Sequence, residues 1–429
     1  MKILYDISYS LRGVSGIPRD AIDLAEILLD IPECRFLLFP SKRIASKRSG
    51  IEIQAQIGQA LRNSHPRLSF RPSLNLIRDI FFSLLAPRRL RYERPDDNIR
   101  KNITISGLNI PTSRIRIANL TIGERWLRMI FRRTFRLTPK ECDLYIQQQI
   151  DPFSIARGTK AIIRLHDILP ITHPEFFTQK ATEVFWFSLK RIIKNRGNIT
   201  WVMDSKATAL EFKKLLNPGG DVLVIPCAIG DDCIRNETKV NNDNKQNQII
   251  MVNTIEPRKN VEFVVDNFIR AKKSGLIDST WSLKILGSKG WESSQLLKKL
   301  AQLDDSGEIH YFDGASRTEV LEELSSSKVF VTASLAEGFG LPPLEALARG
   351  CRVLASSIPQ HVETLGTRAK YFNPTDAEDF LERLGLACNV EADMSAEERI
   401  DNLNFVHANF SKEFLKNAWV KLIHDVIKQ

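Results

Sequence analysis

The sequence predicts an α/β protein with two Rossmann-like domains. At 429 residues and 43% apolar composition, the chain is too long for one hydrophobic core and can fill at least two. Strand patterns alternate with helical patterns in both halves, which is typical of parallel sheets covered by helices. We expect an N-terminal domain over residues 1–235, a polar linker over 236–248 and a C-terminal domain over 249–410.

The N-terminal half opens with a strand, a turn and a helix. "KILYDIS" has the pattern of a buried strand, "LRGVSG" that of a tight turn, and "IPRDAIDLAEILLDI" that of an amphipathic helix with Pro18 near its start. After a basic insertion at about 41–140, the alternation returns with "KAIIRLHDILP", "TEVFWFSLKRIIK", "NITWVMDS" and "KATALEFKKLL". These segments predict a parallel sheet.

The C-terminal half repeats this order beyond the linker "NETKVNNDNKQNQ". Strand patterns in "IIMVNTI", "WSLKILGS", "IHYFDGA", "KVFVTAS" and "CRVLASS" alternate with helical patterns, as in a second Rossmann-like domain. The last stretch, residues 411–429, has helical periodicity and is a candidate for packing back on the N-terminal domain.

Composition indicates a reducing compartment. The six cysteines are scattered without CxxC spacing, so we expect neither a zinc site nor a disulfide framework. Since no apolar run approaches the roughly 20 residues that span a bilayer, a cytoplasmic location is expected.

The positive charge is concentrated in the basic insertion. Residues 41–140 hold 22 Lys and Arg against 6 Asp and Glu, whereas the whole chain has a net charge of +10. In "GERWLRMIFRRTFRL" the arginines fall on one helical stripe, opposite bulky apolar residues. We expect residues 74–140 to dock on an anionic membrane, which would make the protein peripheral on the cytoplasmic face of the inner membrane. The alternative is that these helices bury their apolar faces internally.

The loop "EGFGLPPLE" places two acids around a glycine-rich turn at the carboxyl end of a strand. Glu337 lies in the loop, and Glu345 lies in the first turns of the helix that Pro342 and Pro343 begin. Amides at a helix N-terminus attract phosphate, while carboxylates accept hydrogen bonds and repel it. The ligand is therefore expected to carry both phosphate and hydroxyls.

"EPRKN" follows another strand in the same half. It sets Arg258 and Lys259 side by side, where they are candidates for gripping a diphosphate. On spacing alone, a solvated surface dipeptide is the alternative.

Four stretches of the second half carry a family resemblance. "VNTIEPRKN", "LGSKGW", "VTASLAEGFGLPPLEALARGCRVLASS" and "IPQHVETLG" resemble the donor domain of the family 4 glycosyltransferases, which are retaining enzymes of the GT-B fold with two Rossmann-like domains facing each other across a cleft. The resemblance implies that Glu337 contacts hydroxyls of the transferred sugar and that Glu345 holds the ribose of the nucleotide. It further implies that Arg258 and Lys259 bind the diphosphate. Backbone amides around Phe339, Gly340 and Leu341 would contact the sugar and the phosphate.

Two stretches of the first half extend the resemblance. "RLHDILPITHPEFF" is similar to the family's histidine motif, which implies that His166 lies next to the reactive carbon of the sugar, with Asp167 supporting the site. "GVSGIPRDA" is similar to the glycine loop after the first strand, where Gly16 would let the backbone approach the diphosphate. A tight turn and a structural histidine are the alternatives from the residues alone.

The expected function is metal-independent transfer of a hexose from a nucleoside-diphosphate sugar to a saccharide or lipid-linked saccharide. The chain has no Asp-x-Asp metal signature, so we expect no cofactor and assign the leaving-group charge to the protein. The motif variants "LGSKGW" and "IPQHVETLG" look most like those of enzymes of bacterial surface-polysaccharide or lipopolysaccharide assembly. Several such enzymes transfer mannose or rhamnose, so GDP-mannose is the first choice of donor. The alternatives are a glycoside hydrolase, another GT-B sugar-nucleotide enzyme, and a protein that binds an anionic polymer, although no nucleic-acid partner is expected.

Overall fold

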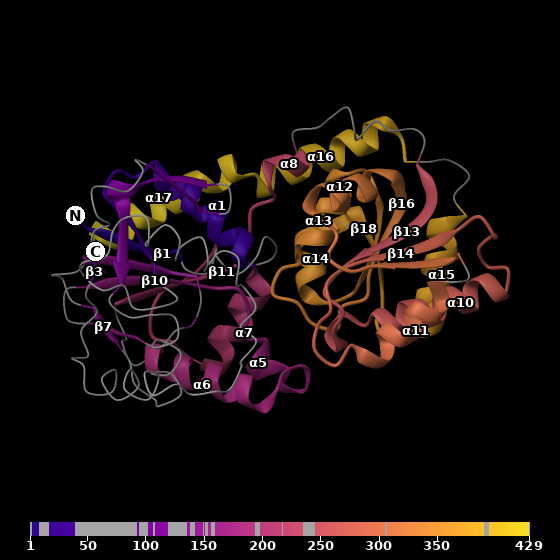
Figure 1. Ribbon diagram of the computed structural model, residues 1–429, viewed down its shortest axis with the longest axis horizontal. Coiled ribbons are helices and arrows are strands. Elements are labelled where there is room, and N and C mark those ends of the chain that lie inside the picture. Colours follow the sequence, from indigo (N-terminus) through magenta and orange to yellow (C-terminus); the bar gives the residue numbers. More distant parts are fainter. Residues whose placement is uncertain are drawn as a thin grey trace. The chain divides into compact units, whose positions relative to one another are not determined.

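The computed structural model describes most of the chain outside the basic insertion. The described residues are 2–7, 17–38, 92–93, 102–105, 108–118, 135–137, 142–148, 150, 153–155, 159–193, 198–216, 218–234, 245–304, 307–389 and 394–428. They form two compact units, and Figure 1 shows that each has a sheet with helices packed on it. Unit 1 takes its residues from 1–204, 209–225 and 418–429, and unit 2 from 205–208 and 226–417.

Unit 1 is built on a sheet of eight described strands in the order β12-β11-β10-β8-β1-β2-β6-β3. Its strands pair in parallel, apart from the antiparallel pair β3 and β6. The strands are β1 (Ile3–Asp6), β2 (Cys34–Leu38), β3 (Tyr92–Glu93), β6 (Ile115–Ala118), β8 (Leu144–Gln147), β10 (Lys160–Leu165), β11 (Ile199–Met203) and β12 (Val222–Val224). Two small sheets pair β4 (Asn102–Ile105) with β5 (Leu108–Pro111) and β7 (Phe135–Leu137) with β9 (Phe153–Ile155).

Helices of unit 1 cover apolar strands. They are α1 (Ile17–Leu29), α5 (Leu169–Thr172), α6 (Gln179–Ile193) and α7 (Lys206–Leu216), the last of which begins in unit 2. β10 and β11 are almost entirely buried, as expected for strands of a parallel sheet covered on both faces. Their core side chains pack with Leu189 and Ile192 of α6 and Phe212 of α7.

Unit 2 has a sheet of six described strands, all parallel, in the order β15-β14-β13-β16-β17-β18. The strands are β13 (Gln246–Val252), β14 (Ser282–Leu286), β15 (Ile309–Phe312), β16 (Ser327–Thr332), β17 (Arg352–Ser356) and β18 (Ala369–Phe372). The helices are α8 (Asp231–Ile234), α10 (Val261–Lys273), α11 (Ser294–Asp304), α12 (Arg317–Ser326), α13 (Leu341–Ala348), α14 (Pro359–Leu365), α15 (Ala377–Cys388), α16 (Ala396–Phe410) and α17 (Lys412–Lys428), the last of which begins in unit 2 and belongs to unit 1 from Ala418 onward.

Alternate side chains of the central strands of unit 2 fill two separate cores. Val329 and Val331 of β16 pack in one core with α10 and α15, whereas Phe330 packs in the other with α13 and α16. This follows from the two-residue period of a strand, which directs successive side chains to opposite faces. The sheet is therefore buried on both faces, and its strand ends are where polar side chains gather.

The units divide the chain ahead of the expected linker. The boundary lies between Ile225 and Pro226 because the following segment, through α8, packs with α13 and α16. β13 begins at Gln246, inside the stretch 236–248 expected as linker. Residues from Ala418 onward group with unit 1, where Lys160 Nζ donates to Val426 O at 2.8 Å. Most of the basic insertion lies outside the described residues. Of the helix expected at 123–137, only the last three residues are described, and they form the strand β7 instead.

The described part of the chain contains no candidate for a membrane-spanning helix. None of its helices combines the length and apolar character that crossing a bilayer requires.

The core of unit 1 generates a first prediction. The buried ring of Phe212 lies 4.9 Å from that of Trp201, centroid to centroid, so Phe212→Ala should lower the free energy of unfolding by about 3–5 kcal/mol. Leu210 on the same helix is 69% exposed, and Leu210→Ala should change this free energy by less than about 0.5 kcal/mol. Urea unfolding of both variants measures the difference, and equal losses would contradict the assigned packing.

Candidate active site

Polar side chains gather at the carboxyl ends of strands in both units. In unit 1 these are Gln148 after β8, His166 after β10 and Asp204 after β11. In unit 2 the acid loop, residues 334–340, follows β16, and Arg258 and Lys259 follow β13. This is the edge at which open parallel sheets bind ligands.

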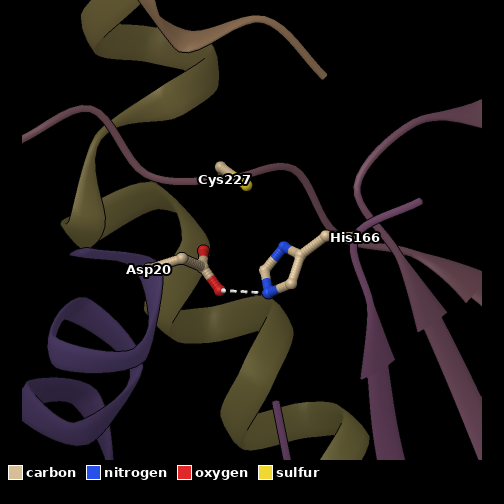
Figure 2. A group of neighbouring side chains, drawn as sticks. All are labelled: Asp20, His166 and Cys227. Atoms are coloured by element: carbon tan, nitrogen blue, oxygen red, sulfur yellow. Dashed lines mark ion pairs between the residues drawn. The ribbon is translucent and has the colours of Figure 1, made fainter. Parts of the chain in front are cut away.

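His166 is held at both ring nitrogens. Nδ1 lies 2.7 Å from Asp204 Oδ2, and Nε2 lies 3.0 Å from Gln148 Oε1. Asp20 of α1 adds a longer ion pair, with its Oδ2 3.9 Å from Nε2, and Figure 2 shows this carboxylate facing the imidazole. Since the ring is only 8% exposed, its orientation is fixed.

Arg164 carries the positive charge beneath this histidine. Its Nε lies 2.6 Å from Asp20 Oδ2, and its Nη2 lies 3.1 Å from Asp204 Oδ1. The guanidinium is fully buried and sits over the ring of Trp419 at 5.4 Å. Arg164 therefore ties α1 to the ends of β10 and β11 and spaces the two carboxylates around His166.

The surroundings favour a charged imidazole. Burial by itself lowers the pKa of His166, but the charge of Asp204, its hydrogen bond and the charge of Asp20 outweigh burial, so the pKa is raised. With both ring nitrogens facing oxygen acceptors, the imidazolium is the form that satisfies every contact.

Asp167, which was also singled out in the first half, bonds the backbone next to it. Its Oδ1 accepts a hydrogen bond from the amide of Leu169, the first residue of α5, at 3.0 Å. The carboxylate bonded to His166 is that of Asp204 instead. Gly16 lies outside the described residues.

In unit 2 the backbone of the acid loop turns sharply into α13. Gly340, the residue before the helix, has φ +95°, a left-handed conformation that favours glycine. Pro342 and Pro343 follow in the first turn, where a missing amide costs nothing. The side chain of Phe339 is buried against Phe410, so only its backbone can meet a ligand.

Glu337 is the centre of the bonds in this loop. Its Oε2 accepts from Arg258 Nη1 at 2.8 Å, and its Oε1 accepts from Lys259 Nζ. Ser334 Oγ also donates to Oε1, at 2.7 Å. Burial alone would raise the pKa of Glu337, but the adjacent charges of Lys259 and Arg258 hold it well below its usual range. The carboxylate is therefore ionised and can only accept hydrogen bonds.

Arg258 and Lys259, which are expected to bind a diphosphate, therefore form ion pairs with Glu337, which is expected to bind the sugar. Arg258 also pairs with Glu256 at 2.7 Å, and its carbonyl accepts from the amide of Leu335 at 2.8 Å. Burial lowers the pKa of Lys259, and the charge of Glu337 only partly offsets this. The surface-dipeptide alternative fails, because both side chains are largely buried in one ion cluster.

Glu345 is held by a residue that the sequence did not single out. Arg317 Nη1 lies 2.7 Å from Glu345 Oε1, and Arg317 Nε lies 3.0 Å from Asp232 Oδ2. Burial lowers the pKa of Arg317, but the charges of Glu345 and Asp232 raise it overall. This contact holds one carboxylate oxygen of Glu345, which lies in the middle of α13.

Part of the chain matches a known protein family, and longer stretches match individual relatives. Residues 234–400 match a family model described as Glycosyl transferases group 1. The chain is 26% identical over 240 residues to the O-antigen chain mannosyltransferase RfbU of Salmonella typhimurium, covering 56% of this chain and 63% of the relative. It is 28% identical over 287 residues to the serotype-specific mannosyltransferase WbdA of Escherichia coli, covering 62% of this chain and 34% of the relative. It therefore spans less than two thirds of the length of either relative.

Solved structures share the fold over the whole chain. Sucrose-phosphate synthase from Thermosynechococcus elongatus superposes with a TM-score of 0.62 at 12% identity, covering 100% of this chain and 99% of that one. Anabaena HepE, solved in complex with UDP and glucose, has a TM-score of 0.59 at 13% identity, covering 99% and 100%. The predicted GT-B fold is confirmed by these likenesses and by the two parallel sheets.

The histidine cluster generates a second prediction. Since the pKa of His166 is raised in the folded protein, its stabilising contribution is present below about pH 6.5 and lost as pH rises through the folded pKa. Asp204→Asn should lower the pKa of His166 and flatten this decline in the free energy of unfolding. NMR titration of the ring and urea unfolding against pH measure both effects.

The matched control is Glu175→Gln. Glu175 is exposed and bonds His173 rather than His166, so its replacement should leave the pKa of His166 unchanged. An unchanged pKa in Asp204→Asn would contradict the assigned ion pair.

Proposed function

Since this chain carries a group 1 glycosyltransferase domain at residues 234–400 within a GT-B fold, we propose that it is a retaining hexosyltransferase. It moves a hexose from a nucleoside-diphosphate sugar to a saccharide or lipid-linked saccharide in polysaccharide or lipopolysaccharide biosynthesis. The ion cluster of Arg258, Lys259 and Glu337 beside the N-terminus of α13 carries this proposal, because it offers cations for phosphate and acceptors for hydroxyls.

The donor is proposed to be GDP-mannose. The relatives from Salmonella typhimurium and Escherichia coli are both described as mannosyltransferases, and the first of them acts on the O-antigen chain. These names support the sugar and the class of acceptor, while the choice of guanine as the base comes from the family resemblance.

The residues of the acid loop, the start of α13 and the loop after β13 have separate proposed roles. Arg258, Lys259 and the amides of Phe339, Gly340 and Leu341 bind the diphosphate, and Glu345 accepts from the ribose. Glu337 accepts from a hydroxyl of the transferred hexose, for which its permanently ionised carboxylate is suited. Because the two cations are bonded to Glu337, the diphosphate has to compete for them.

The proposed reaction exchanges one glycosidic bond for another. The bond between the anomeric carbon and the phosphate oxygen breaks, and a bond from that carbon to the acceptor oxygen forms on the same face. The departing phosphate oxygen takes the proton of the acceptor hydroxyl. Arg258 and Lys259 stabilise the charge that develops on the leaving group, so we propose that no metal ion is required. His166 and Asp167 are assigned to the catalytic step by the family resemblance.

The hydrolase alternative fits this acid loop less well. A glycoside hydrolase needs a carboxylic acid whose pKa is raised so that it can protonate the leaving group. The pKa of Glu337 is shifted in the opposite direction by two cations. A carboxylate so held is suited to accepting hydrogen bonds from a sugar.

Membrane association is a further part of the proposal. With a lipid-linked acceptor, sugar transfer would take place at the cytoplasmic face of the inner membrane. The excess positive charge of residues 41–140 would favour binding to anionic lipid there.

A third prediction tests the nucleotide site. Calorimetric titration in EDTA against GDP, UDP, dTDP and ADP should give the tightest binding for GDP. Arg258→Gln should weaken that binding by about tenfold or more, since hydrogen bonds between charged groups are lost. Arg270→Gln removes the same charge from an exposed pair with Glu378 and should leave binding unchanged. The proposal fails if no nucleotide binds, or if both variants lose affinity equally.

A fourth prediction concerns the basic insertion. At low salt, sedimentation should recover the protein with vesicles containing anionic lipid and not with neutral ones, and high salt should release it because charges are screened. Replacing Arg125, Arg128 and Arg132 by Gln should reduce the bound fraction severalfold. Replacing three solvent-accessible cations of unit 2 by Gln, namely Arg270, Lys289 and Arg383, should not reduce it. Equal retention by neutral vesicles would rule out the electrostatic mechanism.

A further inference from the structure

His361 is a buried histidine next to the acid loop. It lies in α14 and has no exposed surface. Its Nδ1 lies 3.1 Å from Ser356 O and 3.1 Å from Ser356 Oγ. Because a carbonyl oxygen can only accept, Nδ1 carries the proton. Ser356 Oγ in turn donates to Ser334 O at 2.6 Å, and Ser334 Oγ donates to Glu337. A chain of hydrogen bonds therefore connects His361 to the carboxylate of Glu337.

The other ring nitrogen of His361 has no partner. Burial lowers the pKa of His361, so the ring is neutral and Nε2 carries a bare lone pair. Among the residues that the structure describes, none donates to this atom. Buried acceptors without a partner are rare in folded proteins, and one beside a ligand-binding loop points to a hydrogen-bond donor that arrives with the ligand.

Nε2 lies next to Gly340, the residue before α13. A Cβ atom placed on Gly340 would lie 3.2 Å from Cδ2 and 3.4 Å from Nε2 of His361. The ring edge therefore packs against the bare α-carbon of Gly340, a residue of intermediate burial. The charged groups that act on the ring are those of Glu337 and Lys259.

The chemistry of this corner defines what it can bind. A lone pair on a neutral imidazole accepts a proton and repels phosphate oxygens, and ionised Glu337 likewise only accepts. A ligand group that satisfies both atoms must donate two hydrogen bonds, as two hydroxyls of one sugar ring do. Phosphate and ribose already have other proposed partners in Arg258, Lys259 and Glu345.

We propose that Nε2 of His361 accepts a hydrogen bond from a hydroxyl of the transferred hexose, next to the hydroxyl that Glu337 accepts. This rests on the proposed function and makes His361 a determinant of sugar specificity. Since Gly340 packs against this ring edge, the contact requires the loop at Gly340 to shift when the donor binds. A donor lacking that hydroxyl would leave the lone pair unsatisfied and bind more weakly.

Two variants separate this role from a purely structural one. In His361→Gln the side-chain amide reaches the place of Nε2, whereas in His361→Asn it reaches only the place of Nδ1 and keeps the bond to Ser356. Calorimetry with GDP and GDP-mannose should give unchanged GDP affinity in both variants. GDP-mannose should bind about tenfold more weakly to His361→Asn and nearly normally to His361→Gln. Single-deoxy donors should identify one hydroxyl whose loss weakens the natural protein but not His361→Asn.

If GDP-mannose instead binds more weakly to His361→Gln than to His361→Asn, only the bond from Nδ1 to Ser356 matters, and the proposal is overturned. If neither nucleotide binds the natural protein, the proposed function fails and this inference fails with it. Nitrogen NMR of the unaltered protein avoids dependence on how the variants fold. The Nε2 resonance of His361 should move on adding GDP-mannose and not on adding GDP, and a resonance indifferent to both ligands would also overturn the proposal.

Discussion

The ion pairing of the buried Glu337 carboxylate is the interaction on which the candidate site of unit 2 depends. An ionised group with 8% exposure is tolerated only because Arg258 and Lys259 neutralise it and Ser334 completes its hydrogen bonds. These bonds join the loop after β13 to the loop after β16, and the amide of Leu335 adds a backbone bond to Arg258. Residues far apart in the chain are therefore held in place as one cluster at the strand ends.

Unit 1 solves a similar problem with another set of residues. Arg164 has no exposed surface and lies between Asp20 and Asp204, so three buried charges and His166 compensate one another at the ends of β10 and β11. In both units a rigid parallel sheet supplies the positions, and the ion pairs fix the side chains that emerge from it. Such support is what a site needs in order to keep its geometry.

The sequence predicted those parts of the molecule that follow from local patterns. Strand and helix alternation predicted the two sheets, and the "EGFGLPPLE" motif located Glu337 at the end of β16 and Glu345 in α13. Partners distant in sequence were missed: Arg317 lies 28 residues before Glu345, and Asp204 lies 38 after His166. Asp204 could have been found, since it follows a buried strand just as His166 does. The boundary at Pro226 was missed because burial of α8 depends on helices more than 100 residues later.

The course of the chain also bears on how the protein is made. Unit 1 is assembled from segments at both ends of the chain, since Trp419 packs against Arg164 and the carbonyl of Val426 binds Lys160. Unit 2 needs little beyond one continuous stretch, residues 226–417. During synthesis, unit 1 therefore cannot be completed until the stretch of chain that forms unit 2 has emerged. Until then Arg164 lacks the cover of Trp419. The incomplete unit 1 therefore exposes surface that chaperones can protect.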